Sequence, residues 1–245
     1  MQRDDRDPGK VMFKLQYRDA AHLQDQWNRH LSRGRTFVST TEQLPVGTSL
    51  RISLGFRGLR QPILLAGRVI GTGQKGQETG VEVEIHFAST AEHDRVASLI
   101  ERAALGDPKV CMRLVHVLLV EDNPHIAELV TVGLKEMAQR DFGGNITFDV
   151  TWVSDGAAAS AAVEKHRFDV LLCDIYLPVM DGAKFIREVR QSQRPDLPVI
   201  ALSAGGETAR QMALEAGCNV FIQKPLRLTE LRDALRSLLQ LDSSV

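Results

Sequence analysis

The sequence has few cysteines, no long apolar run and almost no net charge, and each shortage excludes a class of protein. Its three cysteines, Cys111, Cys173 and Cys218, lie far apart and show neither CxxC spacing nor a neighbouring histidine. This argues against both a disulfide framework and a zinc site. No run approaches the roughly 20 apolar residues that a transmembrane helix needs, and residues 1–10 lack the apolar core of a secretory signal. We therefore expect a cytoplasmic protein with no membrane insertion.

The balance of charge bears on nucleic-acid binding. The 245 residues include 30 Lys and Arg against 31 Asp and Glu, which gives a formal net charge of −1. Proteins that bind DNA commonly carry a basic face or a helix-turn-helix, and this sequence shows neither, so we expect no DNA binding. Hydrophobic residues make up 43% and charged residues 25%, a composition that suits one large or two ordinary globular domains.

The second half of the chain alternates between strand patterns and helix patterns. Five runs predict strands: LVHVLLV, ITFDVTWV, FDVLLCD, PVIALSA and NVFIQKP. Helical patterns follow them at about 124–137, 156–166, 182–191 and 207–216, and in a last leucine-rich stretch from residue 228. Such alternation predicts an α/β fold with a parallel sheet that helices cover on both faces.

The first hundred residues predict short strands and turns with almost no helix. The strand segments KVMFKLQY, TFVST, TSLRISLGF, PILLAGRVIG and GVEVEIHF are separated by turns rich in proline and glycine. This pattern favours a mainly antiparallel barrel or sandwich. The capping box from Ser89 to Glu92 then predicts a helix that ends near Gly106. We expect domains at residues 1–106 and 114–245 with a linker at 107–113.

Polar residues stand at the ends of four predicted strands of the second domain. In an open parallel sheet, ligands bind outside the carboxyl ends of the strands, where the strand order reverses. With the order 2-1-3-4-5, Glu121, Asp122 and Asp174 would meet in one pocket, and clustered carboxylates favour a bound cation such as Mg²⁺. Ser203 and Lys224 end the fourth and fifth strands. They could bind a phosphoryl group while Asp174 attacks it and forms an acyl phosphate.

The segments VLLVEDNP, LLCDIYLPVMDG, IALSA and FIQKP resemble the receiver domain of bacterial two-component response regulators over roughly residues 114–242. The family has a flavodoxin-like α/β fold with a five-stranded parallel sheet. The resemblance implies that Asp174 is the phosphoacceptor. It also implies that Glu121, Asp122 and Asp174 hold Mg²⁺ together with the backbone carbonyl of Tyr176.

The same resemblance implies a switch that responds to phosphorylation. Ser203 is similar to the family's switch hydroxyl, Lys224 to its phosphate-binding lysine and Phe221 to its switch aromatic. Lys224-Pro225 is similar to the family's cis peptide. No segment resembles the catalytic parts of a histidine kinase, so the donor would be a partner histidine kinase, a phosphotransfer protein or a small phosphodonor. The chain would not be an enzyme beyond its own phosphorylation and dephosphorylation, and a homodimer is compatible with the family.

The first domain resembles a PilZ domain, more loosely, through LSRGRTFVSTTEQLPVGTSLRISL, ILLAGRVIG and TGVEVEIHF. Many PilZ domains bind cyclic di-GMP with RxxxR and [DN]xSxxG segments. Here the second segment is HLSRGR, in which His30 and Arg35 replace the amide or acid and the glycine. Arg29 and Arg33 have the RxxxR spacing but overlap that segment, while Ser32 remains. We therefore favour a protein-interaction patch over nucleotide binding.

Three functions are open at this point. The favoured hypothesis is a response regulator in which phosphorylation of Asp174 switches the protein contacts of the receiver and PilZ-like domains. The second is a cyclic di-GMP receptor that the receiver gates. The third is a scaffold whose partner binding does not depend on phosphorylation. The sequence names no downstream partner.

Overall fold

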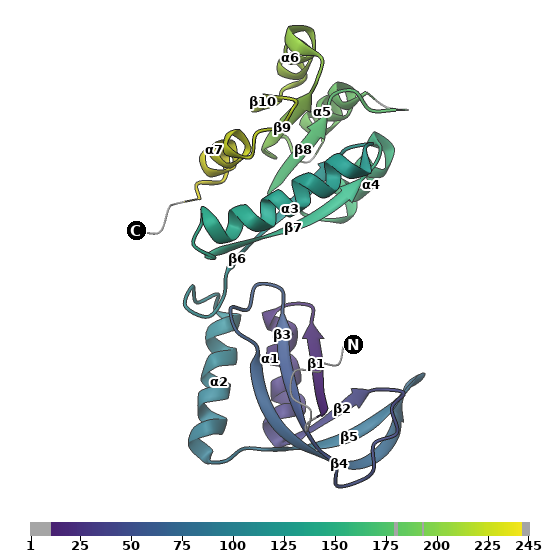
Figure 1. The fold of residues 1–245 in the computed structure, drawn as a ribbon, viewed down its shortest axis with the longest axis vertical. Coiled ribbons are helices and arrows are strands. Elements are labelled where there is room, and N and C mark those ends of the chain that lie inside the picture. Colours follow the sequence, from purple (N-terminus) through teal and green to yellow (C-terminus); the bar gives the residue numbers. More distant parts are fainter. Residues whose placement is uncertain (1–10, 179–180, 193, 242–245) are drawn as a thin grey trace. The chain divides into compact units, whose positions relative to one another are not determined.

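The computed structural model describes residues 11–178, 181–192 and 194–241, and no helix within these ranges is long and apolar enough to cross a membrane. The expectation that residues 1–10 form no secretory signal lies outside the described residues. The chain divides into two compact units, residues 1–112 and 113–245 (Figure 1). The division falls after residue 112, inside the predicted linker of residues 107–113. The part of this linker that includes Val110 belongs to the first unit, because Val110 is buried in its core. Each unit is described by itself below.

The second unit contains a five-stranded sheet in the order β10-β9-β8-β6-β7. All four pairings are parallel. If the strands of this unit are numbered 1 to 5 along the chain, the order across the sheet, from the β7 edge to the β10 edge, is 2-1-3-4-5. The predicted topology is therefore confirmed. The strands are β6 (Arg113–Val120), β7 (Ile146–Val153), β8 (Val170–Asp174), β9 (Val199–Ser203) and β10 (Val220–Gln223).

Five helices cover this sheet, as the helical patterns predicted. They are α3 (Pro124–Arg140), α4 (Gly156–Lys165), α5 (Gly182–Gln191), α6 (Gly206–Ala216) and α7 (Leu228–Leu239). The helices α3 and α7 pack on one face and α4, α5 and α6 on the other. Successive strand residues point to opposite faces of the sheet. Leu119 of β6 therefore packs in the core under α3 and α7, and Leu118 packs in the core under α4, α5 and α6. Double coverage explains why β8 and β9 are buried throughout.

The first unit contains a mixed five-stranded sheet in the order β1-β3-β4-β5-β2. Three pairings are antiparallel, whereas β1 and β3 pair in parallel. All five strand segments that the sequence predicted are present, and the PilZ-like barrel stays a prediction. The strands are β1 (Val11–Tyr17), β2 (Arg35–Ser39), β3 (Ser49–Phe56), β4 (Ile63–Lys75) and β5 (Glu78–His86). The predicted helix after them is α2 (Thr90–Ala104), capped by the Ser89 hydroxyl, which accepts from the Glu92 N–H at 3.2 Å.

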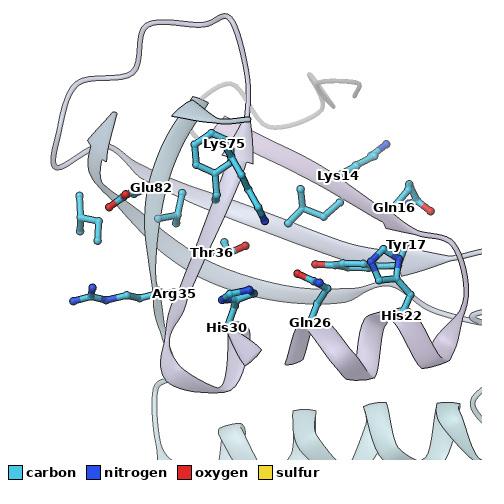
Figure 2. Close-up of a pocket in the computed structure, with 14 residues that line it drawn as sticks. Lys14, Gln16, Tyr17, His22, Gln26, His30, Arg35, Thr36, Lys75 and Glu82 are labelled. Carbon is cyan, nitrogen blue, oxygen red and sulfur yellow. The ribbon is translucent and has the colours of Figure 1, made fainter. Parts of the chain in front are cut away.

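The prediction of almost no other helix in this unit was wrong. Helix α1 (Ala20–Arg29) and a short 3₁₀ turn, η1 (Leu31–Arg33), follow β1. The carboxylate of Asp19 caps α1 by accepting from the His22 N–H at 2.8 Å. The helix buries Leu23 and Trp27, which are one helical turn apart, and most of its other residues are polar. So narrow an apolar stripe is a weak signal in sequence. Side chains of α1, β1 and β2 line a cavity in this unit (Figure 2).

Candidate functional site

The strand order of the second unit brings three carboxylates together. Strands β6 and β8 are neighbours, with Val120 opposite Cys173. The residues that follow these two, Glu121 and Asp174, therefore stand side by side. One carboxylate oxygen each of Glu121, Asp122 and Asp174 lies within 4.8 Å of the others. Glu121 is fully buried and Asp174 is 7% exposed, while Asp122 faces solvent.

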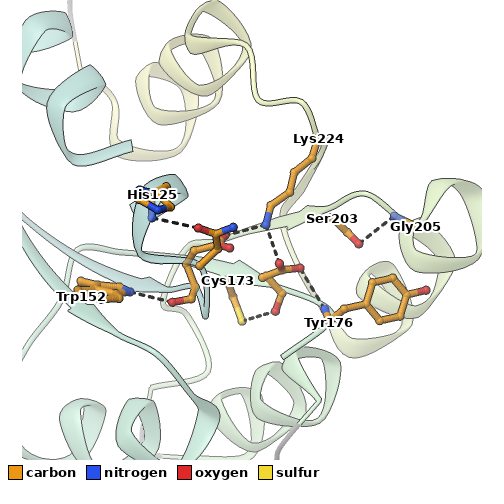
Figure 3. Close-up of polar contacts among 10 residues, drawn as sticks. His125, Trp152, Cys173, Tyr176, Ser203, Gly205 and Lys224 are labelled. Atoms are coloured by element: carbon orange, nitrogen blue, oxygen red, sulfur yellow. Dashed lines mark hydrogen bonds and ion pairs between the residues drawn. The ribbon is translucent and has the colours of Figure 1, made fainter. Parts of the chain in front are cut away.

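The ammonium of Lys224 bridges two of these carboxylates (Figure 3). Its Nζ lies 2.7 Å from Oε2 of Glu121 and 2.6 Å from Oδ2 of Asp174. Burial alone lowers the pKa of Lys224, but the hydrogen bonds to Asp174 and Glu121 outweigh burial and raise it. Lys224 is therefore positively charged, and a single cation stands against two buried acids.

The charge of the pocket is not fully compensated. Oε1 of Glu121 is buried and has no hydrogen-bond partner in the described part of the chain. Burial raises the pKa of Glu121, although the Lys224 ammonium opposes this rise. A buried oxygen without a partner is costly, and a third carboxylate, that of Asp122, lies beside it. Glu121, Asp122 and Asp174 could thus hold a hard cation with oxygen ligands.

Local contacts hold the Asp174 carboxylate and its strand end in place. Oδ1 accepts from the backbone N–H of Tyr176 at 3.0 Å, while Oδ2 faces Lys224. A Cβ added to Gly182, the first residue of α5, would lie 1.9 Å from the carbonyl oxygen of Asp174. Gly182 therefore allows α5 to begin directly against the end of β8. The thiol of Cys173 donates to the same carbonyl at 3.2 Å, and burial raises the pKa of this thiol, which stays protonated.

The remaining predicted residues lie at neighbouring strand ends. Ser203 is fully buried, and its hydroxyl accepts from the Gly205 N–H at 3.2 Å. Its carbonyl accepts from the Lys224 N–H at 2.8 Å, which ties the ends of β9 and β10 together. Phe221 on β10 is partly buried against the core under α4, α5 and α6. The Lys224-Pro225 peptide is cis, as the resemblance implied.

Two neighbours of the pocket were not singled out in sequence. The Trp152 indole donates to the backbone carbonyl of Glu121 at 2.8 Å and so holds the residue after β6 (Figure 3). The second is Gly205, where an added Cβ would lie 2.3 Å from the ring of Tyr176. Neither residue belongs to a pattern that sequence reasoning could connect with the carboxylates, because each acts through a tertiary contact.

The four predicted residues of the first unit have different surroundings, and their role stays a prediction. Arg29 is paired with Asp25, with Nε 2.7 Å from Oδ1. The backbone carbonyl of Ser32 lies 3.3 Å from a ring nitrogen of His93, and the Arg33 side chain is exposed. Of the four, Arg35 alone lines the large cavity of this unit.

Comparisons with known proteins concern the second unit. The family model for the response regulator receiver domain matches residues 117–236. The chain is 38% identical over 120 residues to the autoinducer 2 sensor kinase/phosphatase LuxQ of Vibrio vulnificus, covering 49% of this chain and 13% of that protein. It is 38% identical over 140 residues to the probable transcriptional regulatory protein TcrX of Mycobacterium tuberculosis, covering 57% and 53%. The chain thus spans about half or less of these relatives.

Solved structures give matches of similar extent. The receiver domain of a sensor histidine kinase from Pseudomonas aeruginosa, with a magnesium ion coordinated in its active-site cleft, is 34% identical, with a TM-score of 0.44 and coverage of 51% of this chain and 98% of that one. A putative response regulator from Chloroflexus aurantiacus is 28% identical, with a TM-score of 0.47 and coverage of 52% and 99%. On the strength of the family match and the curated relatives, residues 117–236 of this chain are a response regulator receiver domain.

Proposed function

We propose that this chain is a two-component response regulator in which phosphorylation of Asp174 switches the protein contacts of the receiver and of the first unit. The contact that carries the proposal is the Lys224 ammonium, 2.6 Å from Oδ2 of Asp174 and 2.7 Å from the buried Glu121. An acyl phosphate needs an ionised carboxylate as nucleophile and positive charge for the phosphoryl oxygens. Asp174 and Lys224 supply both.

The proposed cofactor is Mg²⁺, held by Glu121, Asp122, Asp174 and the backbone carbonyl of Tyr176. Support for the fit comes from the three carboxylate oxygens within 4.8 Å of one another and from the unpartnered Oε1 of Glu121. When bound, Mg²⁺ would supply positive charge that offsets the negative charge of the phosphoryl group.

In the proposed reaction, an oxygen of Asp174 attacks the phosphorus of a phosphohistidine on a partner histidine kinase or phosphotransfer protein. A bond from this oxygen to phosphorus forms, the phosphorus–nitrogen bond breaks, and the released imidazole takes up a proton from solvent. Lys224 already contacts Asp174, so its ammonium is in place to bind a phosphoryl oxygen. The Ser203 hydroxyl accepts a hydrogen bond from Gly205 and keeps its own proton for donation to the phosphoryl group. Inward movement of Ser203 would make room for Phe221 to turn.

The other two hypotheses receive less support. A cyclic di-GMP site built from Arg29, Ser32, Arg33 and Arg35 would need these side chains together, yet Arg29 is paired with Asp25 and only Arg35 lines the cavity. A scaffold that ignores phosphorylation would have no use for a buried, incompletely compensated acidic pocket. Such a pocket is costly to maintain.

Intact mass spectrometry after incubation with acetyl phosphate tests the proposal. Wild-type protein should gain the mass of one phosphoryl group when Mg²⁺ is present and lose this gain when EDTA is added. Asp174→Ala should gain nothing, whereas Asp233→Ala, which removes an exposed carboxylate on α7, should behave as wild type. A folded wild-type protein that stays unmodified under conditions that phosphorylate a control receiver would contradict the proposal and favour the scaffold.

A further inference from the structure

A groove runs between the two edge strands of the first unit. The sheet order places β1 and β2 at the edges, and within the described residues neither strand has a second strand as neighbour. A cavity of about 990 Å³ is lined by residues 14–17 of β1 and 35–37 of β2 (Figure 2). A second cavity, of about 480 Å³, is lined by residues 11–13 of β1 and by residues 39–42 at and after the end of β2. The two cavities thus follow one another along the same pair of strands.

The lining residues also show how the strands face each other. The start of β1 lies across from the end of β2, and the end of β1 lies across from the start of β2. The two edges are therefore antiparallel. Side chains of a strand alternate between its faces, so consecutive lining residues mean that the groove follows the strand edges. An edge presents backbone N–H and C=O groups that can pair with another strand.

The dimensions suit an extended segment. Both cavities together involve all seven residues of β1. At about 3.3 Å per residue, the groove is on the order of 20 Å long. A compact anion such as phosphate would occupy a small part of it.

Positive charge collects in the larger cavity. Lys14, Arg35 and Lys75 line it, against one acidic residue, Glu82. In Figure 2 the lysines come from β1 and β4 and the arginine from β2, and Lys75 extends toward the other lining side chains. The smaller cavity carries the opposite charge, since it is lined by the acidic residues at positions 42 and 78.

Apolar and neutral polar side chains complete the larger cavity. Leu15, Phe37 and Ile70 supply apolar surface, and Gln16 and Tyr17 supply hydrogen-bonding groups. Burial raises the pKa of Tyr17 to about 12, so its hydroxyl remains a donor at neutral pH. An alternation of apolar and acidic side chains in a ligand would match this lining, because neighbouring residues of a strand point in opposite directions.

We propose that the groove between β1 and β2 binds an extended segment of a partner protein, whose backbone pairs with a strand edge and whose acidic side chains lie in the larger cavity near Lys75. Main-chain pairing gives such complexes affinity, and side-chain pockets give them specificity. The occupant is a peptide and not a small organic anion, because the groove continues along both edges beyond the basic cavity. All of its residues lie in the first unit, so the inference does not depend on phosphorylation of Asp174.

Selection of peptides provides the test. A random ten-residue peptide library displayed on phage is selected against the full-length chain. In one half of the enriched sequences, the half that reaches the larger cavity, Asp or Glu should alternate with β-branched or aromatic residues. The other half, which reaches the acidic smaller cavity, should lack Asp and Glu, and the centre should lack proline. A synthetic enriched peptide should then bind Lys75→Glu about tenfold or more weakly than wild type, as expected for loss of a close charge pair. Arg95→Glu, at an exposed position of α2 that lines neither cavity, should leave its affinity unchanged.

Several outcomes would overturn the proposal. These are the absence of any enriched peptide, enrichment of basic peptides, or equal affinity for wild type and Lys75→Glu when circular dichroism shows that both are folded. Binding of adenosine triphosphate that depends on Lys75, in the absence of peptide binding, would assign the groove to a small anion instead. Peptide binding that survives in Asp174→Ala would separate this inference from the proposed phosphorylation switch.

Discussion

At the scale of single residues, the receiver pocket depends on one cation shared between two buried acids. Lys224 is 13% exposed as a side chain, Asp174 9% and Glu121 1%. Removing one partner of a buried ion pair leaves a desolvated charge without compensation, which costs far more than an exposed ion pair contributes. If Asp174 is phosphorylated as proposed, the pocket links stability and phosphorylation through the same side chain.

Lys224→Ala should lower the free energy of unfolding of the receiver by about 3 kcal/mol at neutral pH. Burial already raises the pKa of Glu121, and without Lys224 the folded state should favour the protonated acid further. An acid with a raised folded pKa gains stability as pH falls. The deficit should therefore shrink from neutral toward acidic pH in urea unfolding curves. Lys184→Ala, at an exposed position of α5, serves as control, and a deficit that stays constant with pH would contradict this account.

Gly182→Ala should disturb the end of β8. The added Cβ would meet the Asp174 carbonyl oxygen at 1.9 Å, so α5 or β8 must shift, and overpacking of this kind costs about 2 kcal/mol. We expect slower phosphorylation by acetyl phosphate together with a lower urea midpoint. Gly71→Ala is the matched control, because its added Cβ would find its nearest atom at 3.8 Å. Unchanged phosphorylation and stability in Gly182→Ala would show that the helix start is more tolerant than its contacts indicate.

At the scale of elements, helix caps and packed faces decide where each segment begins and ends. Asn123, Asp155 and Asp181 accept backbone hydrogen bonds at the starts of α3, α4 and α5. Three of the receiver helices thus begin at capping side chains. The same device begins α1 at Asp19, in a segment with little other helical signal. Capping therefore has most influence on α1, whose apolar stripe is narrow.

Asp19→Ala should increase amide hydrogen exchange along α1, because loss of an N-cap costs about 1 kcal/mol. The His22 N–H, followed by Arg18, lowers the pKa of Asp19. An acid with a lowered folded pKa stabilises the fold above its usual pKa of about 3.9, and this contribution is lost as pH falls through the folded pKa. The difference in exchange between wild type and Asp19→Ala should therefore diminish in acid. Asp19→Asn, which retains a capping oxygen, should exchange much like wild type, and equal protection in all three proteins would exclude a role for the cap.

At the scale of the whole molecule, each unit has its own hydrophobic core. The core of the first unit lies between its sheet and helices α1 and α2, and the receiver has one core on each face of its sheet. At the division between residues 112 and 113, the backbone hydrogen bonds of the chain pass from the first unit to the second. The N–H of Met112 donates to Gly58 in the first unit, and that of Arg113 donates to Asn145 in the second.

Residues 113–245 expressed alone should therefore fold and accept a phosphoryl group on Asp174. Their thermal unfolding should be cooperative, with a midpoint close to that of the receiver transition in the full chain, since a domain with its own core folds alone. Differential scanning calorimetry and intact mass after acetyl phosphate treatment would measure both properties. Failure to fold would mean that the receiver draws stability from the first unit.

Prediction from the sequence was most complete for the receiver. Its strands and helices follow strongly periodic patterns, and the order 2-1-3-4-5, which those patterns predict, places Glu121, Asp174 and Lys224 at one edge of the sheet. Their roles in phosphorylation stay predictions. Helix α1 was missed because Leu23 and Trp27 are its only buried residues. The groove was missed as well, since β1 and β2 face each other only through the order of strands in the sheet.

By itself, the sequence determined which segments become strands and helices of the receiver and which polar side chains stand at its strand ends. These features follow from local periodicity and turn residues, so neighbouring positions in the chain suffice to specify them. Only the tertiary structure decided that Lys224 lies between Glu121 and Asp174, that Gly182 stands against the end of β8, and that two edge strands enclose a groove. Such contacts join residues far apart in sequence, and their distances depend on how the packed elements meet.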